Sequence, residues 1–521
     1  MGAAASIQTE LAKPKDASDI PEGTDAAKSE VARLRKLIRS QYVRSRPLKD
    51  IGSDGSITCV EQVQAALDAI SEGDKSINAC CEIVQGALEL AAAADAKLLE
   101  GAPRRPLEGV PIIVKANVDV AGTLSTASLP ALADWRPSKT APIAQRLIDA
   151  GAIVVAKTNM PEAALGIWGF SPVHGITKNP INENYTTGGS SAGTAAGIAA
   201  GYVLAGVGSD TGGSLRIPAE CCNIVGFRPS KDRYPQTGVV PCNIEHDRAG
   251  PMASTVRNLA VLDAVMAGEP VSESQNAADL SKVVFGVASD LYSDACDAHK
   301  AAIDTTVAIL KSKGAKVINN SDIQFKSMQA TFTHKAELDF REQGLDDYLA
   351  SHNECKLSTD EVLEKSFYSA VLKPFFKTPK SFSGPLTNVK SIPDTEREAA
   401  VTTFREEIAS HQAAYEKFFM DRNTDVIITP CIHNPPQKCL SEEEYQDFKN
   451  AFATFGMATG PSAGSFLYNQ LPSAPSLAFP TQVKYSGLDG NPMACGLLLW
   501  GKPGNDKRLI QIAMALEDAS K

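Results

Sequence analysis

Two serines of this 521-residue sequence stand directly after paired glycines, and both could act as nucleophiles. Ser190 ends the segment Thr-Thr-Gly-Gly-Ser, and Ser214 ends the segment Asp-Thr-Gly-Gly-Ser. Glycine accepts positive φ angles and has no Cβ, so it lets backbone N–H groups come close to a substrate atom. The successive N–H groups of Thr211, Gly212 and Gly213 therefore predict an oxyanion-binding nest just ahead of Ser214. A serine on such a turn suits acyl transfer.

Other roles for these glycines fit the sequence less well. A phosphate-binding P-loop needs the pattern GxxxxGK[ST], and no lysine directly follows either glycine pair. A dinucleotide-binding turn is disfavoured because the strand has already ended within GVGSDTGG and no helix with a third glycine follows. A Ser-His-Asp hydrolase is disfavoured because none of the seven histidines lies in a comparable turn. Close packing would explain one glycine turn, but two in one short unit favour chemistry.

The serine needs a proton acceptor, and Lys115 is the next candidate after histidine. Lys115 ends the apolar run VPIIV (110–114), and no further charge occurs before Asp119. A lysine that faces inward at a strand end is desolvated, which disfavours the ammonium and lowers its pKa towards that of a general base. The alternative is an ordinary lysine whose ammonium reaches solvent while its alkyl chain is buried. The residues alone leave both interpretations open.

An alternation of apolar strands and helices, beginning at about residue 50, must position these residues. The segments QRLIDAGAIVV and VAILKSKGAKVI each predict a helix that ends at a glycine and is followed by a strand. Such units predict parallel pairing and an α/β sheet covered on both faces. Residues 325–400 predict a mostly helical insertion near the site, broken by prolines. Five apolar runs predict buried strands: VPIIV (110–114), AIVVA (152–156), VVFGVA (283–288), DVIITP (425–430) and LLLW (497–500).

Composition and charge narrow the class of protein. The chain is 43% hydrophobic and 21% charged, and it has no apolar run long enough to predict a membrane-spanning helix. Its formal charge of −10 and its lack of long basic blocks predict no nucleic-acid partner. None of the 11 cysteines forms a CxxC pair, which predicts reduced thiols and no metal site. Without a recognisable secretion signal, the sequence predicts a cytoplasmic protein.

The N-terminal region differs in composition from the rest of the chain. Residues 1–28 are rich in small and polar residues and predict a disordered tail, whereas residues 29–49 predict a basic amphipathic helix. The first six residues fit the pattern MGxxx[ST], which indicates N-myristoylation at Gly2. With the basic helix as a second signal, N-myristoylation would bring the N-terminus into peripheral contact with a membrane. We favour two other interpretations, a plain tail and a helix docked on the catalytic domain, because short N-terminal patterns match by chance and the docking face is well formed.

Four segments together resemble the amidase signature enzymes: PLEGVPIIVKANVDV (106–120), TTGGSSAGTAAGIAAG (186–201), GSDTGGSLRIPAECCNIVGFRPS (208–230) and LPSAPSLAFPTQVKYSGLDGNPMACGLLLWGKPGNDKRLI (471–510). The resemblance implies one catalytic domain over residues 50–521 with the amidase signature fold. That fold is α/β, with a large central mixed, mostly parallel β-sheet covered by helices on both faces. Within the family, GFRPSKDRYPQTGVVP (226–241) is most similar to aryl-acetamide hydrolases such as indoleacetamide and mandelamide hydrolases.

The resemblance also implies roles for individual residues. Ser214 matches the nucleophile, Ser190 matches a bridging serine that follows a cis peptide bond, and Lys115 matches the base. Three further residues are implied to support the site through hydrogen bonds: Ser191, Asp210 and Arg216. The implied reaction cleaves a carboxylic amide to an acid and ammonia or an amine through an acyl-enzyme, with no cofactor or metal.

The substrate is the least specified part of this prediction. The chain has Ala192 and Ser209 where the family usually has Gly and Thr, and 491–494 departs from a common Gly-Leu-Pro-Val. We expect the last departure to alter the acyl pocket. A small aryl or apolar acyl amide is the expected substrate and partner, and a homodimer is the expected assembly. The alternatives are a glutaminase subunit of a tRNA-dependent amidotransferase and a fatty-acid or peptide amide hydrolase.

Overall fold

The computed structural model describes most of the region expected to be catalytic. The described residues are 48, 57–274, 276–318, 336–366, 394–432, 438–441, 443–444, 474–486, 490 and 492–521. The predicted tail at 1–28 and the predicted helix at 29–49, apart from Leu48, lie outside them, as do parts of the predicted insertion at 325–400. None of the helices in the described residues is long and apolar enough to cross a membrane.

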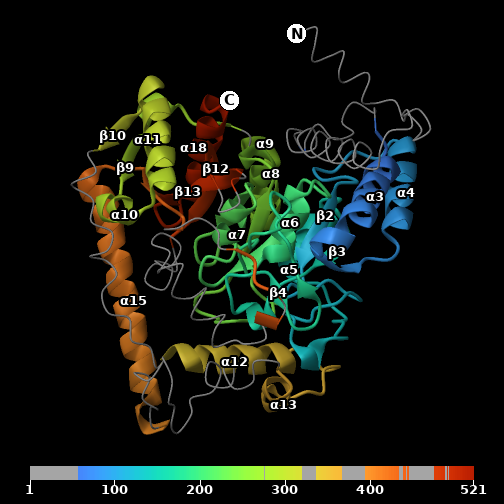
Figure 1. Ribbon diagram of the computed structural model, residues 1–521. Helices are drawn as coiled ribbons and strands as arrows, with labels where there is room; N and C mark the ends of the chain where they lie inside the picture. Colours follow the sequence, from blue (N-terminus) through green and yellow to red (C-terminus); the bar gives the residue numbers. More distant parts are fainter. Residues whose placement is uncertain are drawn as a thin grey trace.

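An eleven-stranded sheet forms the centre of the molecule (Figure 1). Strand β2 pairs in parallel with β3 and β6, and β9 pairs in parallel with β10 and β11. All other neighbouring strands of this sheet pair antiparallel. The predicted α/β class and mixed sheet are confirmed. In sheet order the strands are β1 (Cys80–Ile83), β3 (Ile153–Thr158), β2 (Pro111–Lys115), β6 (Ala205–Asp210), β8 (Arg248–Ala253), β7 (Val225–Arg228), β12 (Ser476–Ser486), β13 (Pro492–Gly501), β11 (Val426–Thr429), β9 (Val284–Val287) and β10 (Lys316–Ile318). A separate two-stranded sheet pairs β4 (Phe170–Ser171) with β5 (Gly175–Ile176).

Both predicted helix–glycine–strand units occur in the fold. Helix α5 (Pro142–Asp149) leads through Gly151 into β3, and helix α11 (Asp297–Ser312) leads through Gly314 into β10. Gly151 and Gly314 have φ angles of 103° and 81°, a region that residues with a Cβ rarely adopt. Each of the two strands pairs in parallel, with β2 and with β9 respectively.

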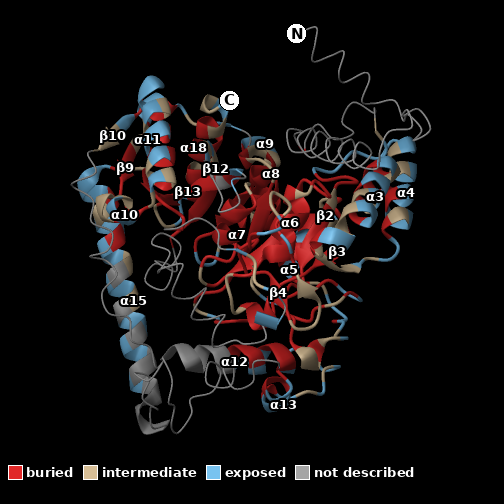
Figure 2. Ribbon diagram, viewed as in Figure 1, coloured by how far each residue is buried: buried red, intermediate tan, exposed pale blue. Residues whose placement is uncertain are grey.

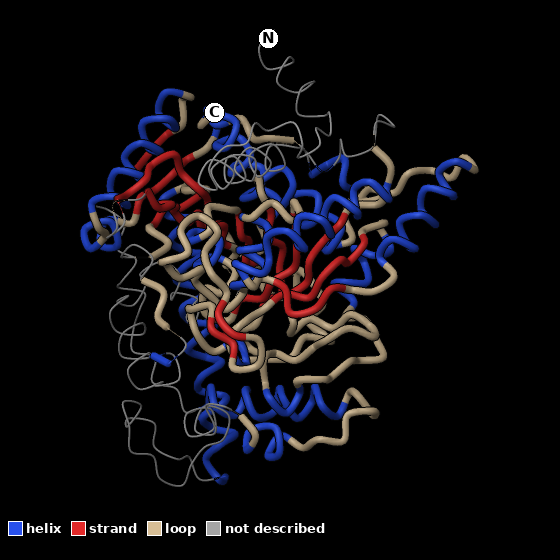
Figure 3. Tube along the Cα trace, turned by 45° about the vertical axis from the view of Figure 1, so that its right-hand side comes forward, coloured by secondary structure: helices blue, strands red, loops and turns tan. Residues whose placement is uncertain are grey.

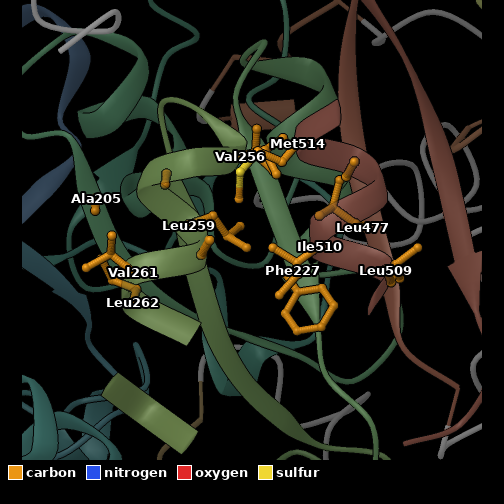
Figure 4. Close-up of a cluster of buried hydrophobic side chains, with 14 of the residues drawn as sticks. Ala205, Phe227, Val256, Leu259, Val261, Leu262, Leu477, Leu509, Ile510 and Met514 are labelled. Atoms are coloured by element: carbon orange, nitrogen blue, oxygen red, sulfur yellow. The ribbon is translucent and has the colours of Figure 1, made fainter. Parts of the chain in front are cut away.

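The sheet is buried on both faces because successive strand residues point to opposite sides. In β11, Val426 and Ile428 belong to one apolar cluster and Ile427 to another. The first cluster includes residues of α5, α8 (Val256–Ala267), α11 and α18 (Asp506–Ala519), and Figure 4 shows its part between α8 and α18. The second includes residues of α3 (Cys59–Ile77), α4 (Ala87–Leu99), α6 (Ala192–Ala199), α7 (Arg216–Cys221) and α15 (Asp394–Arg422). Figure 2 shows this burial concentrated around the sheet and on the inner sides of its covering helices.

Helix α6 lies against the sheet more closely than larger side chains would allow. All of its residues are buried. A Cβ on Gly193 would lie 2.2 Å from the carbonyl oxygen of Ala79 and 2.5 Å from the backbone nitrogen of Asn159. A Cβ on Gly197 would lie 2.8 Å from Cδ1 of Ile113 in β2. The Ala/Gly composition of α6 is therefore needed to hold its first turn, which follows Ser190, near the end of β2.

Parts of the predicted insertion form the helices α12 (Ala336–Ala350) and α13 (Thr359–Glu364) and the start of α15. Helices α12 and α13 lie beyond the loops at one edge of the sheet, and α15 runs along the side of the molecule (Figures 1 and 3). Tyr348 Oη donates to Asp119 Oδ1 at 2.9 Å, and His352 Nε2 lies 3.0 Å from Asp119 Oδ2. These contacts attach α12 to the segment that directly follows β2, and so to the surroundings of Lys115. The described residues also form the helices α9 (Val271–Ser274) and α10 (Ser289–Asp294).

Candidate active site

Lys115 is the last residue of β2, and its side chain is completely buried. Val114, the residue before it, faces the apolar cluster around α8, so Lys115 faces the opposite side, where α6 lies. Nζ of Lys115 donates to Ser190 Oγ at 2.7 Å and to Ser209 Oγ at 2.9 Å. Asn117 Nδ2 also donates to Ser209 Oγ, at 3.0 Å. The buried amine therefore directly contacts one of the two serines singled out from the sequence.

Burial changes the protonation of this lysine. It lowers the pKa of Lys115 from 10.5 to about 7, and desolvation is the largest cause. The negative charges of Asp210 and Asp247 act in the opposite direction, but they do not restore the ordinary value. Near neutral pH a large share of Lys115 is therefore unprotonated, and it can accept a proton along its hydrogen bond to Ser190.

The first Gly-Gly-Ser segment connects three parts of the site. The Gly189–Ser190 peptide bond is cis, and Ser190 is completely buried. Ser191 Oγ donates to the carbonyl oxygen of Ser209 at 3.0 Å and accepts from the Ser209 N–H at 3.2 Å. The Ser191 N–H donates to the carbonyl oxygen of Ser214 at 3.3 Å. Ser191 thus joins the loop that carries Ser190 to strand β6 and to the second serine turn.

The second Gly-Gly-Ser segment is the turn between β6 and α7. The carboxylate of Asp210, at the end of β6, accepts from the N–H groups of Gly213 and Leu215 at 2.8 and 3.0 Å. Arg216 Nε donates to the same carboxylate at 2.9 Å, and Arg228 Nη1 donates to it at 3.1 Å. Burial raises the pKa of Asp210, but the two buried guanidinium groups outweigh it and hold the pKa well below its usual range. This charged network fixes the backbone on both sides of Ser214.

Ser214 lies within this turn, and 6% of its surface is exposed to solvent. No hydrogen bond joins its hydroxyl to that of Ser190 within the described part of the chain. Hydrogen bonds of this kind are often long in enzymes without substrate and tighten when it binds. The structure therefore brings the Ser190 loop and the Ser214 turn together through Ser191, and it connects Lys115 to Ser190.

The three backbone N–H groups expected to bind an oxyanion are not equivalent. The Gly213 N–H already donates to Asp210, so its expected role requires that this group be shared with the substrate. The N–H groups of Thr211 and Gly212 donate to no described residue. The Thr211 side chain donates to Asp247, which orients the start of the turn. Gly213 also has a φ angle of 111°, so the turn requires glycine at this position.

Several residues that the structure places in the site have no role predicted from the sequence: Asn117, Ser209, Arg228 and Asp247. Asn117 carried a signal, because it follows Lys115 by two positions and so could share its side of the chain. Ser209 was noted only as a departure from the family pattern, yet its hydroxyl accepts from Lys115 and from Asn117. Arg228 and Asp247 had no local signal, because their partners are distant in sequence.

A second lysine has the same sequence setting as Lys115 and occupies a different place. Lys157 follows the apolar run AIVVA, is completely buried, and has a pKa lowered by desolvation to about 8. In the register of β2 with β3, Lys157 pairs with Val114, whereas Lys115 pairs with Thr158. The two lysines therefore point to opposite faces of the sheet. Nζ of Lys157 donates to the carbonyl oxygen of Val118.

Known proteins are similar to this chain over most of its length. The family model described as Amidase matches residues 61–510. A mandelamide hydrolase from Pseudomonas putida is 28% identical over 467 residues, which cover 88% of this chain and 88% of that protein. An indoleacetamide hydrolase from Agrobacterium vitis is 29% identical over 471 residues, which cover 89% of this chain and 94% of that protein. The solved structure of a peptide amidase from Stenotrophomonas maltophilia has the same fold, with a TM-score of 0.71, 23% identity, and coverage of 91% of this chain and 97% of that chain.

Proposed function

Because the chain belongs to the amidase signature family, whose hydrolases cleave amide C–N bonds, we propose that it works through Ser214, Ser190 and Lys115. Ser214 is the nucleophile, Ser190 the bridging hydroxyl and Lys115 the general base. The observation that carries this proposal is the 2.7 Å hydrogen bond from Lys115 to Ser190, made between two completely buried side chains. The lowered pKa of Lys115 supports it, because a base must be unprotonated when the reaction starts.

In the proposed reaction, unprotonated Lys115 takes a proton from Ser190 while Ser190 takes one from Ser214. The Ser214 oxygen then attacks the amide carbon. The relay returns the proton to the departing nitrogen, so that ammonia or an amine leaves and an acyl-enzyme remains. Water adds to the acyl-enzyme by the same proton route, and the acid is released. Asn117 and Lys115 both donate to Ser209, which holds the amine close to Ser190.

The oxyanion of the tetrahedral intermediate would be met by backbone N–H groups of the Ser214 turn. Thr211 and Gly212 supply the N–H groups that donate to no other described residue, and Gly213 supplies one that Asp210 also shares. The Asp210 network holds this turn rigid before substrate binds, and a rigid donor set needs no reorganisation during the reaction.

We propose an aryl or apolar acyl amide as the substrate. Two relatives matched over most of their length bear the names mandelamide hydrolase and indoleacetamide hydrolase. Apolar side chains also lie beside the first serine loop: Ile217 packs with Ile432 and Ile167, and a Cβ on Gly188 would lie 3.1 Å from Ile217 Cγ2. Apolar side chains in this position would favour a substrate with an apolar acyl group over glutamine, whose amino-acid end is charged.

Ammonia release from a matched panel tests both parts of the proposal. The panel contains mandelamide, indoleacetamide, a fatty amide, a peptide amide and glutamine, each assayed with the wild type and with Ser214→Ala. We expect the highest kcat/KM for an aryl amide and loss of turnover for every substrate in Ser214→Ala. A clear preference for glutamine would instead favour the amidotransferase-type glutaminase, and a preference for long-chain or peptide amides would favour a fatty-acid or peptide amide hydrolase.

A further inference from the structure

A second chain of hydrogen-bonded reactive side chains lies outside the Lys115–Ser190–Ser214 set, and it consists of Cys296, His299 and Glu220. From this arrangement we propose that Cys296 is a nucleophilic thiolate and a covalent modification site for small electrophiles, with hydroperoxides as the physiological class. The proposed amidase reaction uses none of these three residues.

The imidazole of His299 stands between the thiol and the carboxylate. Cys296 Sγ lies 3.1 Å from His299 Nδ1, and His299 Nε2 lies 2.6 Å from Glu220 Oε1. Cys296 occupies the position just before helix α11, His299 is in the first turn of that helix, and Glu220 is in α7. The Gly496 N–H donates to Glu220 Oε1 at 3.2 Å, which fixes the carboxylate. A thiol, an imidazole and an acid in this order form a relay that can move the thiol proton to the imidazole.

Burial separates the reactive end of this relay from its supporting end. The side chains of His299 and Glu220 are each 1% exposed. Cys296 is partly exposed, so it is the end of the relay nearest to solvent. The position of Cys296 at the N-terminus of the sixteen-residue helix α11 also favours a negative charge there.

The charges of the cluster favour an ionised thiol paired with a protonated imidazole. Burial raises the pKa of Cys296, but the hydrogen bond and charge of His299 outweigh it, and the pKa falls below its usual value. Burial lowers the pKa of His299, but the Glu220 carboxylate outweighs it, and the pKa lies well above the usual range. Within the part of the chain that the structure describes, the titratable groups that act on Cys296 and His299 are Glu220 from α7 and Cys495 from β13.

Neighbouring thiols supply internal controls. Cys495 also contacts His299, yet burial raises its pKa, and the residue is 1% exposed. Cys431 is completely buried, and burial raises its pKa well above the usual value. These two thiols stay protonated and covered, so the proposal predicts selective reaction at Cys296 and not a general reactivity of the cluster.

A metal site is the alternative use of Glu220, His299 and Cys495, whose ligand atoms lie within 4.8 Å of one another. The positions of the partners around the ring argue for a relay. Cys296 and Glu220 contact different ring nitrogens, as a relay through the imidazole requires, and Cys296 is not one of the three residues of the metal alternative. The 2.6 Å contact between His299 and Glu220 is also shorter than the separation of two ligands on one zinc ion, about 3 Å or more at normal bond lengths.

The proposed reaction with hydrogen peroxide balances without a further reagent. The Cys296 sulfur attacks one peroxide oxygen, an S–O bond forms, and the O–O bond breaks. The departing hydroxide takes the proton held by His299 and becomes water. The products are a cysteine sulfenic acid, a neutral imidazole and water, and the two electrons that reduce the peroxide come from the sulfur.

The decisive experiment is the pH dependence of alkylation of the full chain by iodoacetamide, followed by peptide mass mapping of each cysteine. Iodoacetamide forms a C–S bond and releases iodide, and only the thiolate reacts at an appreciable rate. For an ordinary thiol the rate rises about tenfold per pH unit between pH 6 and 8, because the thiolate fraction rises by that factor. We expect the rate at Cys296 to change less than about threefold over this range. A slope does not depend on how easily the reagent reaches the sulfur, so partial burial cannot imitate the result.

Matched variants connect the flat profile to the relay. Glu220→Gln keeps the shape of the side chain but removes its charge, so we expect the ordinary slope to return and the rate at pH 7 to fall about tenfold. Cys495→Ser should keep the flat profile. Ser214→Ala should also keep it, so the outcome is independent of the proposed amidase function. Cys296→Ser should not be labelled by iodoacetamide at this position. After peroxide treatment it should also lack the dimedone adduct that marks sulfenic acid at residue 296. Its rate of amide hydrolysis should equal that of the wild type.

Three results would overturn the proposal. The first is an ordinary tenfold slope at Cys296 in the wild type, a measurement that needs no variant to fold. The second is faster labelling of Cys495 or Cys431 than of Cys296. The third is stoichiometric zinc in the purified protein whose removal by a chelator is required before Cys296 reacts, which would assign the cluster to a metal.

Discussion

Acidification tests the role proposed for Lys115 most sharply. Its pKa is lowered from 10.5 to about 7, so roughly half of the lysine is unprotonated at pH 7. With the ordinary pKa only about 0.03% would be unprotonated, so burial increases the working base on the order of a thousandfold. We expect kcat/KM to be nearly constant above pH 8 and to fall about tenfold per pH unit below pH 6, as the base becomes protonated.

The assay is ammonia release from an aryl amide between pH 5 and 9, with two lysine variants. Lys115→Met removes the base, so we expect the rate at pH 8 to fall by at least about a thousandfold. Lys157→Met removes the other completely buried lysine, on the opposite face of the sheet, and should keep the wild-type profile with its bend near pH 7. A wild-type profile that stays flat down to pH 5, or a bend that disappears in Lys157→Met, would refute the assignment.

The buried Lys115 should also make the stability of the protein depend on pH. Between pH 7 and 10.5 the unfolded state binds more protons at Lys115 than the folded state does, so this residue makes the free energy of unfolding rise with pH. At pH 7 the buried lysine costs the fold on the order of 5 kcal/mol. Lys115→Met relieves this cost and loses two hydrogen bonds worth about 1 kcal/mol each, so its Tm at pH 7 should equal or exceed that of the wild type. A lower Tm would mean that lost activity reflects a damaged fold.

The remaining predictions concern the site and the N-terminus. A fluorophosphonate probe should label Ser214, as found by peptide mapping, and labelling at another serine would exclude Ser214 as the nucleophile. Ser190→Ala should slow turnover severely but less than Ser214→Ala does, because water can replace the bridging hydroxyl in part. Asp210→Asn should lower the free energy of unfolding in urea by about 3–5 kcal/mol, because it leaves two buried guanidinium groups without their countercharge, and a change below about 1 kcal/mol would contradict this account. Co-expression with an N-myristoyltransferase and azido-myristate tests the pattern at Gly2: a label on the wild type that is absent from Gly2→Ala would show acylation, and an unlabelled wild type that does not bind anionic vesicles would leave residues 1–28 as a plain tail.

Local sequence patterns predicted much of the architecture. The five apolar runs are strands in the structure, because a buried strand must be apolar on both faces whatever its neighbours are. Gly151 and Gly314 end helices, because each adopts a backbone conformation that favours glycine. The antiparallel connections through β7, β8 and β12 had no comparable signal, because strand order depends on partners far away in the sequence.

The chemistry was divided in the same way between sequence and structure. The two Gly-Gly-Ser turns and Lys115 could be picked out from the sequence, because each serine follows a pair of glycines and the lysine follows an apolar run. The supporting residues were not: Arg228 reaches Asp210 across eighteen positions, and Asp247 reaches Thr211 across thirty-six. In the relay, Cys296 and His299 are three positions apart, but the contact between His299 and Glu220 spans seventy-nine positions and had no local mark.

The two buried lysines show most clearly what each level decided. The sequence by itself placed Lys115 and Lys157 directly after apolar runs that predict buried strands, but it left open whether a lysine in that position is desolvated. It could not determine which one meets a serine. The register of β2 with β3 decided that, because Lys157 pairs with Val114 and a shift of one residue turns a side chain to the other face of the sheet. Only the folded sheet therefore places Lys115 against Ser190 and leaves Lys157 bound to a carbonyl oxygen on the other side.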